Sequence, residues 1–140
     1  MKKKIKIVWI CTIVSMIWFS MVSCDLFDNS NSIDGVWKEI GGNNRVVTIN
    51  GSTGTLTSIN TTSPLFLDAI DKGYWAIGSI HWRNLTNTGE FTWSGQWIGI
   101  YNNSNVATGS AWVNGTWTIS SDGQTLSVGN TDGSSTWIKQ

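Results

Sequence analysis

The sequence predicts an all-β domain, an antiparallel up-and-down meander that closes into a small barrel of about 8–9 strands. Alternating apolar and polar segments recur through residues 34–140, and clusters of Gly, Asn, Asp and Ser separate them. The residues between are rich in Gly, Ser, Thr, Asn and Trp and poor in Leu and Ala, as strands are. An open sheet of this length would leave exposed edges, so we expect closure. A two-sheet sandwich is the alternative, and the absence of long connections disfavours it.

The first three expected strands follow one another through short turns. Gly41-Gly42-Asn43-Asn44 and Gly51-Ser52 are the turn segments that separate them. The expected strands are residues 36–40, 45–50 and 53–59.

A single helical signal follows the third strand. Ser63 can cap a helix, Pro64 suits its first turn, and Gly73 stops it. We therefore expect one short helix near residues 64–72.

From Tyr74 onward the pattern predicts only strands and turns. Val113-Asn114-Gly115-Thr116 is the strongest local signal, because Asn-Gly between apolar strands favours a two-residue type I′ hairpin. Another turn is expected at Asn102–Asn105. The expected strands are residues 74–83, 90–101, 106–113, 116–120, 124–128 and 134–139.

Three tryptophans lie 20 residues apart, at Trp97, Trp117 and Trp137. Two strands and two turns of a meander span about 20 residues here, so these side chains are expected to form one layer inside the barrel. Positions 37, 57 and 77 continue the series, with Trp37 at its start. The alternative is coincidence among the many tryptophans.

The N-terminus carries features of a secretory signal: four lysines within residues 2–6 precede an apolar run from Ile7 to Val22. Met21-Val22-Ser23-Cys24 resembles the lipobox of bacterial lipoproteins. The resemblance implies that residues 1–23 are removed, that Cys24 is lipidated, and that residues 24–33 form a polar tether before the barrel domain of residues 34–140. It implies a lipid-anchored protein of the bacterial cell envelope, with the membrane and its face left open. The alternatives are an uncleaved anchor helix and an incidental cysteine.

Removal of residues 1–23 changes the composition. Five basic residues and nine acidic residues remain, a net charge of −4, which disfavours nucleic acid as a partner. Cys24 is then the last cysteine, so no disulfide, thiolate nucleophile or cysteine metal site is expected.

The first expected strand carries a second resemblance. Ile33-Asp34-Gly35-Val36-Trp37 resembles the Gly-x-Trp opening of lipocalin-like and other calycin barrels, and residues 115–140 are similar to the last strands of small lipocalin-like lipoproteins. The resemblance implies a calycin-type barrel in which Trp37 plugs one end. Lys139 is the nearest candidate for the basic residue that covers this tryptophan in lipocalins.

Catalytic signals are weak. His81 is the only histidine, and a lone histidine on a strand is more often a surface or hydrogen-bonded residue than a catalyst. Asp68 and Asp71 are neighbours on the expected helix, where a solvated acidic face is the simpler interpretation. We expect no cofactor, no metal site and no enzyme, although a weak activity that uses His81 stays as the third alternative.

The aromatic residues are the candidates for ligand binding, because tryptophan faces stack on sugars and hold apolar molecules. The candidates are Trp75, Trp82, Trp93, Trp97 and Tyr101. The alternative is core packing, since Trp93, Gly95, Trp97, Gly99 and Tyr101 share one strand face by period two. Two functions follow: a lipoprotein that binds a small apolar or carbohydrate ligand, or an envelope or surface interaction protein whose barrel is fully packed. The protein partner of the second is not specified.

Overall fold

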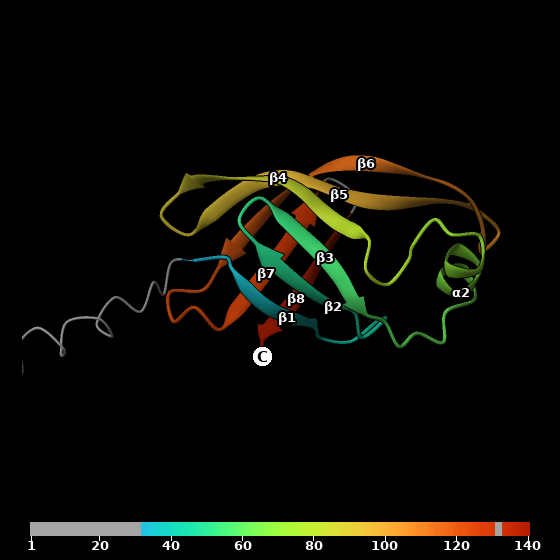
Figure 1. The fold of residues 1–140 in the computed structure, drawn as a ribbon, viewed down its shortest axis with the longest axis horizontal. Coiled ribbons are helices and arrows are strands. Elements are labelled where there is room, and N and C mark those ends of the chain that lie inside the picture. The colour runs from blue at the N-terminus through green and yellow to red at the C-terminus, as the bar shows by residue number, and fades with distance from the viewer. Residues whose placement is uncertain (1–31, 131–132) are drawn as a thin grey trace, which may run out of the picture.

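A computed structural model describes residues 32–130 and 133–140 of the chain. In this part of the chain eight strands form a closed antiparallel barrel, in which each strand pairs with the next and β8 pairs with β1 (Figure 1). The predicted all-β, up-and-down barrel is therefore confirmed, and the sandwich is excluded. The strands are β1 (Gly35–Glu39), β2 (Val46–Asn50), β3 (Thr53–Ser58), β4 (Ile80–Gly89), β5 (Thr92–Asn103), β6 (Val106–Ile119), β7 (Thr125–Asn130) and β8 (Gly133–Lys139).

The predicted short helix is also confirmed, as α2 (Pro64–Asp71) between β3 and β4. Pro64 occupies the first turn and Gly73 follows the last turn with a φ of +72°. Ser63 precedes the helix, but its side chain makes no capping hydrogen bond, and its carbonyl oxygen accepts from the amides of Phe66 and Leu67 instead. The helix lies at one end of the barrel beside the far ends of β5 and β6 (Figure 1).

The hairpin predicted at Asn114-Gly115 is wrong, because β6 runs through these residues without interruption. Gln96 of β5 pairs with Asn114, and Gly95 pairs with Gly115. A type I′ turn needs a positive φ at both central residues, and neither of these two has one. The turn of this hairpin is instead at Ser104 and Asn105, whose φ angles are +51° and +66°, within the turn expected at residues 102–105. The ladder between two long strands thus overrides the local turn propensity, and eight strands result in place of nine.

The strand predicted at residues 74–83 is also shifted along the chain. β4 begins at Ile80 and continues to Gly89, through the residues expected to be a loop. Gly78 has a φ of +86° and bends the segment before the strand, where its amide donates to the carbonyl oxygen of Leu56. Trp75 therefore lies on a connecting segment at the barrel end, where its position does not follow the alternation of a strand.

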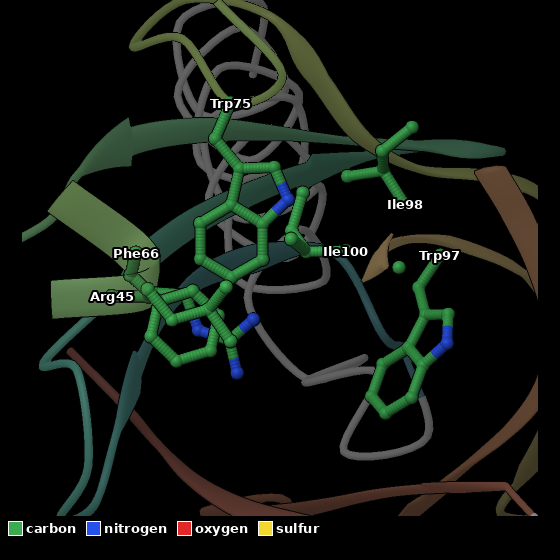
Figure 2. A pocket seen from close by; sticks show the side chains of 8 residues that line it. Arg45, Phe66, Trp75, Trp97, Ile98 and Ile100 are labelled. Atoms are coloured by element: carbon green, nitrogen blue, oxygen red, sulfur yellow. The ribbon is translucent and has the colours of Figure 1, made fainter. Parts of the chain in front are cut away.

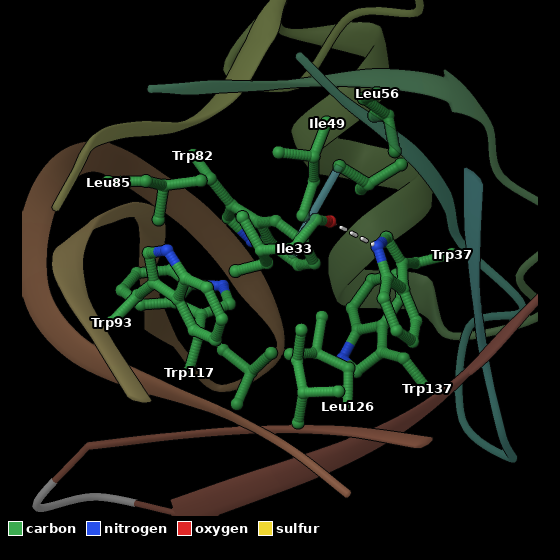
Figure 3. Close-up of a cluster of buried hydrophobic side chains, with 13 residues drawn as sticks. Ile33, Trp37, Ile49, Leu56, Trp82, Leu85, Trp93, Trp117, Leu126 and Trp137 are labelled. Atoms are coloured by element: carbon green, nitrogen blue, oxygen red, sulfur yellow. Dashed lines mark hydrogen bonds between the residues drawn. The ribbon is translucent and has the colours of Figure 1, made fainter. Parts of the chain in front are cut away.

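Tryptophans dominate the core (Figure 3). Trp82 lies at its centre, with its ring edge-to-face against Trp117 at a centroid distance of 5.7 Å and against Trp137 at 4.9 Å. Trp37 and Trp93 complete the aromatic set, and aliphatic side chains from several strands fill the space between them. These rings are at most 6% exposed, so this part of the barrel is a packed interior.

The layer predicted from the 20-residue spacing is realised only in part. Trp117 and Trp137 both enter the core, but Trp93, not Trp97, stands directly opposite Trp117. Trp97 packs against the edge of the core and is only partly buried. Positions 57 and 77 are exposed, so the series does not continue toward Trp37. Strands in a barrel are tilted and unequal in length, so a constant sequence interval does not keep one height along the axis.

Trp37 belongs to the buried core, on the strand that opens the barrel. Its side chain is fully buried, and its Nε1 donates a 2.8 Å hydrogen bond to the carbonyl oxygen of Ile33 (Figure 3). The ammonium group of Lys139 lies 5.5 Å from the centroid of the Trp37 ring. Lys139 therefore lies against Trp37, and the plugging role that the calycin resemblance implies for Trp37 stays a prediction.

Candidate functional site

The candidate site lies at the end of the barrel opposite the start of β1, and we call this end the mouth. It is bordered by Arg45, α2, the segment of residues 73–79, the C-terminal half of β5 and the N-terminal half of β6. Asp68 of α2 holds the helix in place, because its Oδ2 accepts hydrogen bonds from the amide of Ala107 (2.7 Å) and from Nζ of Lys72 (2.8 Å). Lys72 Nζ also donates to the Ala107 carbonyl oxygen at 2.9 Å. The hydrogen bond from Lys72 lowers the pKa of Asp68, so this attachment keeps its charge at neutral pH.

Three ionisable side chains are buried together at the mouth: Glu39, Arg45 and His81. Arg45 Nε donates to Glu39 Oε2 at 2.9 Å and Nη2 donates to Oε1 at 2.5 Å, a bidentate ion pair. Arg45 Nη1 lies 3.1 Å from Nε2 of His81. Because a guanidinium can only donate, Nε2 accepts this bond and the imidazole proton is assigned to Nδ1.

His81 is neutral at ordinary pH. Burial, together with the nearby charge of Arg45, lowers the pKa of His81 to about 3. Glu39 and Arg45 have opposite charges, so the three side chains together carry no net charge. This end of the barrel therefore holds a buried polar cluster that is electrically balanced.

Aromatic rings enclose the guanidinium of Arg45. Its Cζ lies 5.2 Å from the ring centroid of Trp75 and 5.1 Å from that of Trp137, within the range of cation–π contacts. Trp75 in turn stacks on Phe66 of α2, with centroids 4.6 Å apart and planes 14° from parallel. The Trp75 ring also meets His81 edge-to-face at 4.9 Å. These contacts hold the arginine and Trp75 in fixed positions.

A pocket of about 190 Å³ opens beside this cluster. Figure 2 shows Arg45, Phe66 and Trp75 on one side and Trp97 on the other. The residues that line the pocket are Arg45, Leu65, Phe66, Trp75, Trp97, Ile98, Gly99 and Ile100. The pocket is thus mainly apolar and aromatic, with one charged side chain, the arrangement typical of small-molecule sites.

The five sequence candidates separate into three groups. Trp75 and Trp97 line the pocket. Trp82 and Trp93 belong to the packed core. Tyr101 is 59% exposed, because β5 extends beyond the barrel body at this point, and it does not line the pocket.

Sequence reasoning missed Glu39, Arg45 and Phe66 as site residues. A signal for the ion pair was present, since Glu39 lies two residues after Trp37 on the same strand face and Arg45 lies across the turn from it. Two opposite charges that face each other across a hairpin and point inward are an expected pair. His81 was singled out as a lone histidine that is more often hydrogen-bonded than catalytic, and it is buried and bonded to Arg45.

Other expectations concern metals and the membrane. Within residues 32–130 and 133–140, no three His, Cys, Asp or Glu side chains are grouped so that they could hold a metal ion. In the same part of the chain, no helix combines the length and the apolar character needed to cross a bilayer. Cys24, the signal of residues 1–23 and nearly all of the tether of residues 24–33 lie outside the described residues.

Comparisons with protein-family models, with curated proteins and with solved structures each give no match to this chain. The class of protein is therefore described from its structure alone: the described residues form a small closed eight-stranded barrel with a packed interior and an aromatic pocket at one end.

Proposed function

We propose that this chain is a lipid-anchored protein of the bacterial cell envelope whose barrel mouth binds the ring-sized apolar part of a small ligand. The observation that carries the binding proposal is the pocket between Phe66, Trp75 and Trp97, beside the buried Arg45. The lipid anchor rests on the lipobox-like residues that end in Cys24. The proposal includes no catalytic step.

The size of the pocket limits what it can hold. An apolar protein cavity of about 150 Å³ accepts a benzene molecule, so a pocket of about 190 Å³ suits one ring with a short substituent. A larger ligand would place only its end here, because the pocket opens to the surface. A ligand enclosed deep in the barrel, as in large lipocalins, is not proposed, because tryptophans fill that space.

The direction of the mouth agrees with an anchored binding protein. The chain enters β1 at the end of the barrel opposite α2 (Figure 1), where Asp34 Oδ1 accepts a 2.7 Å hydrogen bond from the amide of Gly51. A tether of ten residues, 24–33, can span roughly 35 Å at about 3.5 Å per residue. An anchor at Cys24 would therefore leave the mouth free to face away from the membrane.

The second candidate is an interaction protein with no small-molecule ligand. The packed core favours it, since the barrel body then serves only as a scaffold. The mouth pocket favours the binding proposal. The two candidates differ in a direct test of the pocket.

That test uses NMR titration of the mature chain with ethylbenzene, and it follows the indole N–H signals. Leu65→Trp would fill the pocket from α2, whereas Leu67→Trp changes an exposed residue of the same helix that does not line it. We expect saturable shifts at Trp75 and Trp97 in the wild type and in Leu67→Trp, and none in Leu65→Trp. Unchanged signals in the wild type at saturating ethylbenzene would reject the binding proposal and leave the interaction protein.

The anchor is tested separately in a bacterial host. Metabolic labelling with a palmitate analogue should mark the wild type, and Cys24→Ser should lose both the label and the membrane fraction. A labelled Cys24→Ser protein would contradict lipidation at Cys24.

A further inference from the structure

The indole N–H of Trp75 points to the chemistry of the ligand. Trp75 is 4% exposed, and its Nε1 is buried without a hydrogen-bond partner among the described residues. A buried donor without a partner costs about 1–3 kcal/mol, so such groups call for an explanation. Figure 2 shows this nitrogen on the side of the ring that faces Ile100 and Trp97, toward the pocket.

Two other indoles share the lack of a partner but differ in their surroundings. Nε1 of Trp82 and of Trp117 are also buried and unpaired among the described residues. Both rings lie in the packed core, edge-to-face with each other, and neither lines the pocket. Of the three rings, that of Trp75 lines the pocket, and its buried Nε1 faces the pocket beside Ile100 (Figure 2).

Arg45 adds further donors among the residues that line the pocket. A guanidinium has five N–H bonds, and the hydrogen bonds to Glu39 and His81 use three of them. Each of the two terminal nitrogens of Arg45 therefore keeps one N–H for another acceptor, and Arg45 lines the pocket.

Side-chain acceptors and net charge are both lacking at the pocket. Its other side chains, from Leu65, Phe66, Trp97, Ile98 and Ile100, contain no acceptor atom. Glu39 is engaged by Arg45, and it balances the arginine charge. A sugar ring buried here would find no side-chain acceptor for its several hydroxyl donors, and a carboxylate would meet a cation that already has its anion.

Building on the binding function proposed above, we infer that the mouth pocket selects an uncharged ring that carries an acceptor oxygen, such as an aryl ketone, aldehyde or ester, with that oxygen held by Trp75 Nε1 and Arg45. The apolar walls hold the ring, and the two donors orient the oxygen. Sugars and carboxylates are poor ligands for this site.

The experiment compares matched probes on the mature chain by NMR titration: acetophenone, its near-isostere cumene, benzoate and methyl glucoside. We expect acetophenone to bind about tenfold more tightly than cumene, the value of one good neutral hydrogen bond. The indole N–H signal of Trp75 should move downfield when acetophenone binds. It should show almost no downfield shift when cumene binds.

Trp75→Phe removes the donor and keeps an aromatic ring for Phe66 to stack on. In this variant the preference for acetophenone over cumene should fall to about threefold or less, since Arg45 alone remains. Trp112→Phe, on β6 outside the pocket, should keep the full preference. The downfield shift in the wild type tests the same hydrogen bond should Trp75→Phe fold poorly.

The outcomes separate the inference from the function on which it rests. Equal affinities for acetophenone and cumene would overturn the acceptor inference and leave ring binding intact. Tightest binding of benzoate or methyl glucoside would also overturn it. No binding of any probe would overturn the proposed ligand-binding function and the inference together.

Discussion

The two ends of the barrel use buried groups in different ways. Near the end where β1 begins, Trp37 is part of a core of tightly packed rings, and its Nε1 donates to the carbonyl oxygen of Ile33. At the mouth, Glu39, Arg45 and His81 are also buried, yet a pocket of about 190 Å³ remains beside them. The same sheet builds both ends, because β5 and β6 extend past the barrel body and carry the rim of the mouth (Figure 1).

The packed end contributes mainly to the stability of the fold, whereas the mouth carries the proposed binding site. Apolar area removed from water stabilises the packed end, and every cavity there would cost free energy. The mouth holds a buried ion pair whose two charges depend on each other, which favours a specific arrangement over maximal stability. Substitutions at the two ends should therefore have different consequences.

The largest expected effect is at the centre of the packed core. Trp82→Ala should lower the free energy of unfolding by about 3–5 kcal/mol, because it removes a fully buried ring that contacts Trp117 and Trp137. Tyr101→Ala, at an exposed site on the rim, should change it by less than about 0.5 kcal/mol. Urea unfolding followed by circular dichroism measures both. Similar losses for the two variants would abolish the contrast between the ends.

The ion pair at the mouth should give the next effect. Glu39→Gln should cost about 3 kcal/mol, near the low end for a broken buried pair, because the amide oxygen still accepts one bond from Arg45. Glu39→Gln combined with Arg45→Met should recover much of this loss, since no unpaired charge then stays buried. Unfolding free energies of the two single variants and the double variant form the cycle. Losses that simply add would mean that the two side chains do not interact.

Substitution of two glycines on the β5–β6 hairpin tests how tightly each end of this pair of strands is packed. A Cβ on Gly95 would lie 2.8 Å from Leu85 Cδ2 and 3.0 Å from the Arg83 carbonyl oxygen, so Gly95→Ala should cost about 1–3 kcal/mol. A Cβ on Gly109, toward the mouth, meets nothing closer than 3.8 Å, so Gly109→Ala should be nearly neutral. Thermal unfolding of both variants tests the pair. An unchanged melting temperature for Gly95→Ala would show that the residues around Gly95 can move to accommodate a methyl group, despite the short contacts.

The last prediction concerns pH. His81 has a pKa of about 3 in the fold, below the 6.5 of a free histidine, because it is buried beside Arg45. The unfolded chain therefore binds a proton that the fold excludes between these values. This contribution to stability is fully present above pH 6.5 and is lost as the pH falls toward 3.

Comparison with His81→Gln isolates this contribution, because the carboxylates titrate in both proteins. Between pH 6 and 4 the wild type should lose stability more steeply than the variant, by at most about 1.4 kcal/mol per pH unit. Urea unfolding at several pH values gives the two slopes. Parallel slopes would mean that water reaches His81 in the fold.

Fold-level prediction succeeded where local rules decide the outcome. Pro64 and Gly73 marked the helix correctly, since its boundaries depend on backbone preferences within a few residues, although the Ser63 side chain makes no capping bond. Asn114-Gly115 failed, because the long ladder between β5 and β6 outweighs a two-residue preference. Trp75 was placed on a strand, although the bend at Gly78 puts it on a connection.

The site was predicted less well, for a related reason. Trp75 and Trp97 were named as candidates and do line the pocket, but Trp82 and Trp93 were named with them and are core. Composition and alternation cannot separate an inward ring at the barrel centre from one at its mouth. That distinction depends on the height of each residue along the barrel axis, which follows from strand tilt and register.

By itself, the sequence determined an antiparallel β meander with one short helix, because alternation and turn residues act over short stretches of chain. Only the tertiary structure decided which aromatic rings fill the interior and which border a pocket. It also brought Arg45 to His81, 36 residues later in the chain, and set Glu39 against the same guanidinium. Closure of the barrel aligns such distant residues, and burial then makes their charges and donors depend on one another.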